Sequence, residues 1–178
     1  MIEKTIIETF KLNINEIFKL CIDDNDDMIK GIKEVVDYKQ GQRINNIKKD
    51  VITIKLIDIP KEIPEKIVNM VVNEDGTIVN KIKITLIERT EKNIKLKIKV
   101  KPIANIFFKI NNLLKLSSTK AYITITQTDE IAIINAKYKI KVFFITNEYN
   151  DIIENYMETT LNTLFINNMI NYLKVIEQ

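Results

Sequence analysis

The sequence predicts an α+β fold in which one strand and two short helices precede about six or seven antiparallel strands and one long C-terminal helix. Two observations support this prediction. Isoleucine alternates with lysine over several segments, as in strands with one buried face, and the last segment changes to the helical period. A length of 178 residues with 46% hydrophobic residues is enough for one core, so we expect a single domain over residues 1–178.

The N-terminal part is expected to hold the first strand and both short helices. Residues Glu3 to Leu12 alternate and are rich in β-branched side chains, and Asn13 can then cap a helix. The apolar stripe of the first helix consists of Ile14, Ile17, Phe18 and Cys21. A second helix is expected after the acidic stretch 23–27, with a stripe of Met28, Ile29, Ile32, Val35 and Val36 and with Gly41 closing it.

The middle of the chain is expected to form the sheet. Further strands are predicted at Arg43–Ile47, Val51–Ile59, Ile67–Val72, Thr77–Glu88, Ile94–Lys101, Ala121–Thr126 and Ile131–Ile145. The stretch Asn73–Gly76 predicts a hairpin turn, because its Asp-Gly pair readily takes positive φ. Pro60, Pro64 and Pro102 are expected to end strands, and Ile103–Leu116 is expected to be a short helix or an apolar loop.

The C-terminal segment predicts the longest element. From about Asn150 its apolar residues trace one wide helical face, formed by Ile153, Met157, Leu161, Leu164, Phe165, Ile170, Leu173 and Ile176. Neither glycine nor proline interrupts this segment, and Asn147 or Asn150 with Asp151 can cap its N-terminus. About 27 helical residues would span roughly 40 Å.

This order of elements, together with the segment Asp151–Met157 that enters the last helix after the strand Ile140–Ile145, resembles the START-like helix-grip superfamily, also called SRPBCC. The resemblance covers nearly the whole chain and rests on element order and length. It implies a strongly curved sheet around the terminal helix, with a cavity between them for a lipid, sterol, polyketide or other apolar ligand. The residues that the resemblance places along this cavity are Tyr122, Tyr138, Ile140, Tyr156, Met157, Thr160 and Leu164.

Two functions fit this prediction. The first is a non-catalytic binding or transfer module for an apolar, lipid-like small molecule. The second is a structural or protein-interaction domain with a filled core, in which the same tyrosines and methionine are ordinary core residues. Catalysis is not expected, because the sequence has no histidine for acid–base or Ser/Cys–His chemistry. The one cysteine, Cys21, falls on an apolar helix stripe and is expected to be a buried structural thiol.

We expect neither a cofactor nor a bound metal. Asp23, Asn25, Asp27 and Glu34 occupy positions 1, 3, 5 and 12 of a calcium-loop pattern. Met28 stands at position 6, where such a loop needs glycine, and the same acidic residues suit the N-terminus of the second helix. The helix-terminus interpretation is therefore favoured over calcium binding.

Lysines form the second pattern of interest. Lys81 and Lys83, then Lys95 to Lys101, then Lys137 to Lys141 alternate along three strands, so they are expected to share the solvated face of the sheet. Such a face either protects the protein from aggregation or makes a weak contact with an anionic membrane surface. We expect no aromatic residue among these lysines, which argues against a base-stacking surface and against nucleic acid as a partner.

The chain shows no signal for export or membrane insertion. Glu3 stands where an export signal needs basic residues, and no apolar run approaches the roughly 20 residues that span a bilayer. We therefore expect a soluble, cytoplasmic protein, and a single cysteine suits a reducing compartment. The sequence leaves the oligomeric state open.

Overall fold

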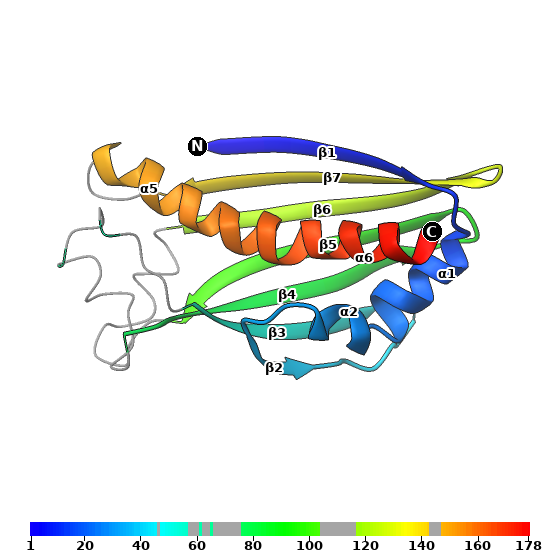
Figure 1. Ribbon diagram of the computed structural model, residues 1–178, viewed down its shortest axis with the longest axis horizontal. Coiled ribbons are helices and arrows are strands. Elements are labelled where there is room, and N and C mark those ends of the chain that lie inside the picture. The colour runs from blue at the N-terminus through cyan, green and yellow to red at the C-terminus, as the bar shows by residue number, and fades with distance from the viewer. Residues whose placement is uncertain (46, 57–60, 62–64, 66–75, 104–116, 143–146) are drawn as a thin grey trace.

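The structure is a computed structural model that describes residues 1–45, 47–56, 61, 65, 76–103, 117–142 and 147–178 (Figure 1). Its elements are β1 (Ile2–Phe10), α1 (Ile14–Phe18), the π-helical turn η1 (Lys19–Asp23), α2 (Asp26–Lys30), β2 (Val35–Lys39), β3 (Lys48–Leu56), β4 (Ile78–Arg89), β5 (Asn93–Ile103), β6 (Ser117–Thr128), β7 (Ile131–Val142), α5 (Asn147–Glu158), the π-helical segment η2 (Thr159–Ile166) and α6 (Asn167–Glu177). No helix among the described residues is long and apolar enough to cross a bilayer.

The seven strands form one curved antiparallel sheet in the order β1-β7-β6-β5-β4-β3-β2. Strands β2 to β7 follow one another across the sheet, and β1 completes the far edge beside β7. The terminal helix, which continues from α5 through η2 to α6, crosses one face of this sheet (Figure 1). Helix α2 lies over β3, and α1 lies at the end of the sheet, where it contacts β6. The predicted α+β helix-grip architecture, with two short helices after the first strand, is confirmed.

The alternation of isoleucine and lysine decides which face of the sheet lies against the helices. Seven alternating residues of β4 and β5 are buried, namely Ile82, Ile84, Leu86, Ile94, Leu96, Ile98 and Val100. The lysines between them point to the opposite side, because successive side chains of a strand alternate. We call the helix-covered side the inner face and the lysine-bearing side the outer face. This orientation agrees with the prediction, since a slip of one residue would bury ammonium groups.

The terminal helix buries one side against the inner face. The buried side chains include Met157, Leu161, Phe165, Ile166, Met169, Ile170 and Leu173. Two positions of the predicted apolar face differ, because Leu164 is only half-buried and Ile176 is exposed. The segment η2 explains part of this difference, since π-helical turns shift the angular position of the residues that follow them. The side chain of Ile153 lies outside the described residues.

The second short helix ends earlier than the sequence suggests, so that part of the prediction is wrong. Helix α2 ends at Lys30, and Val35 and Val36 belong to β2, which pairs with β3. Their β-branched side chains suit a strand better than a helix. Gly41 does not close a helix either, because it packs against β3, where an added Cβ would lie 2.0 Å from the Lys49 carbonyl oxygen.

The strand predicted at Arg43–Ile47 is also wrong. Its described residues form only an isolated bridge between Ile44 and Ile47, and Asn45 between them has a φ of 50°. A residue in this left-handed conformation turns the chain and cannot continue a strand. The strand at this edge of the sheet is instead β2.

Most of the remaining expectations for the sheet are confirmed where the structure describes them. The first strand, the two lysine strands and the last two strands are present, with ends that differ by a few residues. Asn13 caps α1, as its side chain accepts a hydrogen bond from the Asn15 amide at 2.8 Å. The expectation that Pro102 ends its strand is wrong, because β5 continues through Pro102 to Ile103. Pro60, Pro64, the strand Ile67–Val72, the turn up to Asp75 and the segment 104–116 lie outside the described residues.

A buried polar cluster fastens the short helices to the β2–β3 edge. Lys48 and Asp50 of β3 lie 3.4 Å apart and are almost fully buried. Tyr38 donates to Asn25 Oδ1 at 2.5 Å and to Asp50 Oδ2 at 3.3 Å, and Lys48 donates to the Ile22 carbonyl. Burial first, and then the charge of Asp50, raises the pKa of Tyr38. Because these polar groups bind one another inside the protein, the cluster is a structural network.

Candidate functional site

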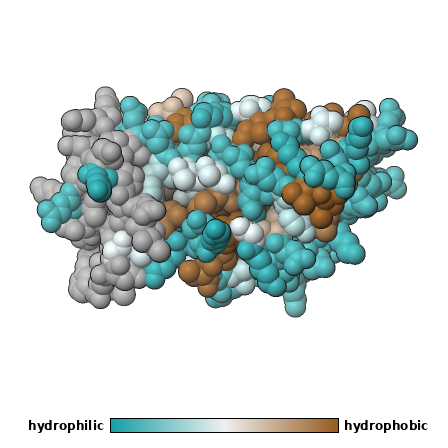
Figure 2. All heavy atoms as spheres, viewed as in Figure 1, coloured by the Kyte–Doolittle hydropathy of each residue, from teal (hydrophilic) through white to brown (hydrophobic). Residues whose placement is uncertain are grey.

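A groove opens between the terminal helix and the β2–β3 edge of the sheet, with a volume of about 480 Å³. Its lining comes from the chain around β2, from β3 and from the terminal helix, namely Lys33, Glu34, Val36, Lys55, Leu56, Tyr156, Thr159 and Leu164. Figure 2 shows hydrophobic side chains that reach the surface beside the middle of the terminal helix. The groove is therefore a place where solvent meets the apolar layer between sheet and helix.

The charged residues of the groove lie on the chain around β2 and on β3, away from the terminal helix. Among the described residues they are Lys33, Glu34 and Lys55. The Lys55 amide donates to the Glu34 carbonyl at 2.9 Å, which ties these two segments together. Leu56 and Leu164 supply apolar surface from opposite walls, so a ligand could combine apolar contact with charges at one rim.

The helix wall of the groove contains an unusual backbone. Tyr156, Thr160 and Leu164 are spaced four residues apart and lie on similar sides of the helix. Tyr156 and Leu164 line the groove, while Thr160 between them is fully buried. From Thr159 to Ile166 the helix is π-helical, and such segments are rare and are frequent at functional sites.

Directly behind this wall lies one polar pair in the apolar interior. Asn80 of β4 and Thr160 of η2 are both 0% exposed, and Asn80 Nδ2 lies 3.3 Å from Thr160 Oγ1. The other end of the amide, Asn80 Oδ1, is buried and has no hydrogen-bond partner among the residues that the structure describes. On the opposite strand Ile54 faces Asn80, and Leu56 of the groove is two residues further along. An unsatisfied polar atom therefore lies in the interior behind residues that line the groove, although neither Asn80 nor Thr160 lines the groove itself.

Asn80 was absent from the sequence-based candidates, although the sequence carries a signal for it. It is the one polar residue in the inward-facing series Ile78, Asn80, Ile82, Ile84 and Leu86. A polar residue at a buried position of a strand needs a partner, and an alternation analysis can identify such a position. The position of its partner on the helix depends on the packing of two elements that are 80 residues apart.

Most of the predicted cavity residues lie on the inner side of the sheet. Tyr156 and Leu164 line the groove, and Met157 and Thr160 are buried beneath the helix. Tyr138 and Ile140 are buried on β7. The structure thus gathers these six between sheet and helix, although they do not all face one groove.

Tyr122 is the exception, and its assignment to the cavity is wrong. Its neighbours Ala121 and Ile123 are fully buried on the inner face, so Tyr122 must point outward and is 49% exposed. Its direct partners across the sheet are Lys97 and Lys137. The prediction assigned this strand residue to the wrong face.

Tyr138 belongs to a polar contact near the start of β1. Its hydroxyl donates to Glu158 Oε1 at 2.5 Å, and the Lys4 ammonium lies 2.7 Å from the same oxygen. Burial acts to raise the pKa of Glu158, but the bonds from Lys4 and Tyr138 outweigh burial and hold this pKa below its usual value. Burial and the nearby Glu158 raise the pKa of Tyr138. This contact fixes the orientation of Tyr138 and leaves a carboxylate ionised at neutral pH.

The outer face carries lysines in direct register across four neighbouring strands. We call this set the lysine row, and it consists of Lys83, Lys99, Lys120 and Lys139. Lys97 is the largest cause of a lowered pKa at Lys99, and further lysines add to the effect. At the β1 end Lys139 lies 3.9 Å from Glu3. Like charges directly opposite each other are unfavourable, so this face is strongly cationic.

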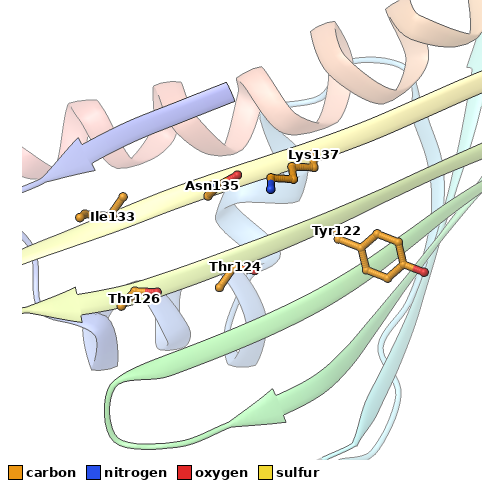
Figure 3. A pocket seen from close by; sticks show the side chains of 6 residues that line it. All are labelled: Tyr122, Thr124, Thr126, Ile133, Asn135 and Lys137. Atoms are coloured by element: carbon orange, nitrogen blue, oxygen red, sulfur yellow. The ribbon is translucent and has the colours of Figure 1, made fainter. Parts of the chain in front are cut away.

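An aromatic residue interleaves with these lysines, contrary to the prediction. Tyr122 lies between Lys97 and Lys137 in the adjacent row, and the Lys97 ammonium is 5.9 Å from the centre of its ring. A shallow groove of about 380 Å³ runs along β6 and β7 on this face, with Tyr122 at one end (Figure 3). Its lining residues are Tyr122, Thr124, Thr126, Ile133, Asn135 and Lys137.

The calcium-loop pattern does not form a cluster of ligands. Asp26 and Asp27 stand in the first turn of α2, as the helix-terminus interpretation predicts. The side chain of Asn25 is already bonded to Tyr38 and to the Cys21 carbonyl. Within the described part of the chain, no group of three or more Cys, Asp or Glu residues could hold a metal. Burial raises the pKa of the Cys21 thiol to about 12, so the thiol stays protonated.

Comparison with known proteins establishes the fold. No protein-family model matches the sequence, and no curated protein matches it. Among solved structures, the Zhui aromatase/cyclase from a Streptomyces species superposes with a TM-score of 0.57 at 7% identity, over 97% of this chain and 93% of that one. A STAR-related lipid transfer protein from Xanthomonas axonopodis gives 0.54 at 10% identity, over 97% and 85%. A protein from Thermus thermophilus gives 0.56 at 8% identity, over 99% and 100%.

Proposed function

We propose that this chain, which has the START-like helix-grip fold, is a non-catalytic binding or transfer module for an apolar small molecule. The observation that supports this function best is the groove of about 480 Å³, in which Leu56, Tyr156 and Leu164 bring apolar surface from sheet and helix to solvent. A groove of this size suits a lipid-like molecule or part of one. The ligand would lie between the terminal helix and the β2–β3 edge.

The fold alone does not decide between carriage and catalysis. One solved protein of this fold is described as a lipid transfer protein and another as an aromatase/cyclase. For this chain we infer carriage, because the sequence has no histidine and the polar pair buried behind the groove, Asn80 and Thr160, is neutral. We also propose that the protein works in the cytoplasm, which suits its single, buried thiol.

Ligand binding can be tested with a neutral dye whose fluorescence rises in apolar surroundings, such as 1-aminoanthracene. We expect saturable binding to the wild type and loss of binding in Leu164→Trp, because the indole would fill the groove. Ile176→Trp is the matched control, since Ile176 is exposed on the same helix outside the groove. Extraction of the purified protein with organic solvent, followed by mass spectrometry, would identify any ligand that it carries. No saturable dye binding and no extracted molecule would favour the filled-core alternative.

A weak contact with anionic membranes is the second function we propose, and the lysine row is the observation that favours it. Nearby lysines each contribute on the order of 1 kcal/mol of attraction to an anionic lipid surface. One tyrosine among the described outer-face lysines makes no stacking platform for successive bases, so we retain the prediction that nucleic acid is not a partner. A membrane contact would bring a carrier of apolar molecules to its source.

A vesicle-binding experiment distinguishes a membrane contact through the outer-face lysines from the alternative that these lysines only keep the protein soluble. Wild-type protein should sediment with vesicles of phosphatidylcholine and phosphatidylglycerol at low salt and should dissociate as salt rises, because screening shortens the range of attraction to about 8 Å. Lys97→Glu with Lys99→Glu should abolish sedimentation. The control Lys19→Glu with Lys92→Glu changes the net charge equally at exposed sites away from the outer face and should not. Equal sedimentation of both double variants would refute the contact.

A further inference from the structure

The buried pair Asn80–Thr160 specifies the chemistry of the ligand more closely than the groove does. We propose that the ligand carries a neutral hydroxyl group, and that this hydroxyl binds the free end of the Asn80 amide behind the groove. This inference rests on the proposed binding function and names the ligand class: an apolar alcohol. Its basis is one juxtaposition: the unsatisfied amide is fully buried directly behind side chains that line the groove, so a ligand reaches it by displacing one of those side chains.

The position of Asn80 connects it with the groove. Asn80 pairs with Ile54 across β3 and β4, and Leu56 follows Ile54 on the same face of β3. Thr160 holds the amide from the helix side, four residues from both Tyr156 and Leu164. The amide thus lies beneath residues that line the groove on both of its walls.

The surroundings of Asn80 make its free atom costly in the ligand-free protein. Ile78 and Ile82, its neighbours on the inner side of β4, are 4% and 0% exposed, and Ile54 opposite is 0% exposed. A buried polar atom that has lost water and gained no partner destabilises a protein. By contrast, the buried Asn25 uses both ends of its amide, one with Tyr38 and one with the Cys21 carbonyl. A buried polar atom that destabilises the ligand-free protein is expected at a binding site, where the ligand supplies its missing hydrogen bond.

The partner that fits this atom is a hydroxyl group. With the amide as assigned, Oδ1 is free and needs a donor. With the amide turned over, Oδ1 would accept from the Thr160 hydroxyl, and a free NH₂ group would need an acceptor. A hydroxyl both donates and accepts, so it satisfies either orientation, whereas an ether or a ketone satisfies only one.

The charge pattern favours a neutral ligand end at this position. The charged side chains of the groove, Lys33, Glu34 and Lys55, come from the chain around β2 and from β3. Among the described residues, the strand neighbours Ile54, Ile78 and Ile82 and the Thr160 hydroxyl surround Asn80, and none of them can neutralise a carboxylate or an ammonium. A fatty acid would therefore hold its carboxylate at the rim, while an alcohol can enter with its hydroxyl first.

The test compares 1-decanol with decyl methyl ether, in which a methyl group replaces the donor hydrogen, by displacement of 1-aminoanthracene. We expect the wild type to bind the alcohol about 3- to 10-fold more tightly than the ether, as one added hydrogen bond allows. Asn80→Leu should remove this preference while the thermal midpoint of the ligand-free protein stays equal or rises. The matched control Asn25→Leu breaks a satisfied network, so it should lower the midpoint and keep the preference.

The outcomes separate the two proposals. Equal affinity of the wild type for both probes would show that the site does not require a donor; this result would overturn the hydroxyl assignment and leave the binding function intact, even if no variant folds. A preserved preference in a folded Asn80→Leu protein would also overturn it, and so would a marked loss of stability in that variant, which would show a structural role. Failure of the wild type to bind either probe or the dye would overturn the binding function itself.

Discussion

Two leucines of the terminal helix, three residues apart, allow the open groove to be distinguished from a filled core. Leu161 is 0% exposed beneath the helix, whereas Leu164 is half-buried and lines the groove. We expect Leu161→Ala to destabilise the protein strongly and Leu164→Ala to destabilise it only slightly. Both changes remove the same three carbons from the same π-helical segment, so helix propensity and backbone effects cancel in the comparison.

The magnitudes follow from burial. Truncating a fully buried leucine leaves a cavity and costs about 3–5 kcal/mol, a large part of a typical folding free energy of about 5–15 kcal/mol. Leu164 already faces a groove on one side, so its truncation removes about half as much contact and leaves no closed cavity. We expect a cost of about 1 kcal/mol at Leu164.

Urea unfolding followed by circular dichroism measures this difference, because the chain has no tryptophan to report on folding by fluorescence. With a denaturant slope of about 2 kcal/mol/M, the midpoint should fall by about 1.5–2.5 M for Leu161→Ala and by about 0.5 M for Leu164→Ala. Similar shifts for the two variants would mean that Leu164 packs as tightly as Leu161. The groove would then be closed in solution, and the filled-core alternative would be correct.

Three further expectations concern other parts of the molecule. Gly41→Ala should lower the thermal midpoint, because the new Cβ would lie 2.0 Å from the Lys49 carbonyl oxygen. Gly76→Ala is the control: its Cβ would have no neighbour within 4 Å, so this variant measures the cost of the positive φ alone. Glu158 has a lowered pKa in the folded state, so its stabilising effect is present at neutral pH and is lost as pH falls through that pKa. Glu158→Gln should therefore flatten the acid side of a stability–pH curve, and an unchanged acid limb would contradict this. Isothermal titration should detect no calcium binding tighter than about 1 mM; micromolar binding lost in Asp23→Ala would contradict us.

The alternation of side chains made most of the sheet predictable. In β5 a lysine follows each of the apolar residues Ile94, Leu96, Ile98 and Val100, and burying the lysines instead of these residues would cost far more free energy than any local conformational preference could offset. The terminal helix was predictable for a similar reason, since its apolar residues recur at helical spacing without glycine or proline. In both cases the free energy of burying apolar rather than charged side chains outweighs every local conformational preference.

The prediction failed where the local sequence pattern competes with contacts between segments that are distant in the sequence. Val35 and Val36 continue the spacing of an apolar helix stripe, yet their pairing with β3 decides their structure, and local sequence does not show that pairing. Tyr122 is amphipathic, so its residue type suits either face, and only its neighbours Ala121 and Ile123 reveal its direction. The contact between Asn80 and Thr160 depends on how the helix lies across the sheet, which no local pattern encodes.

Strand β4 links the two proposed functions, because adjacent residues of it serve opposite faces. Asn80 points inward toward Thr160, whereas Lys81 and Lys83 point outward among other lysines. A neutral, desolvated ligand site and a cationic docking face need opposite surroundings, and a single sheet layer provides both without a second domain. The same geometry couples them, since a slip of β4 by one residue would place Lys81 in the apolar interior and expose Asn80. The buried isoleucines on both sides of Asn80 prevent that slip, so the packing that stabilises the core also keeps the two faces distinct.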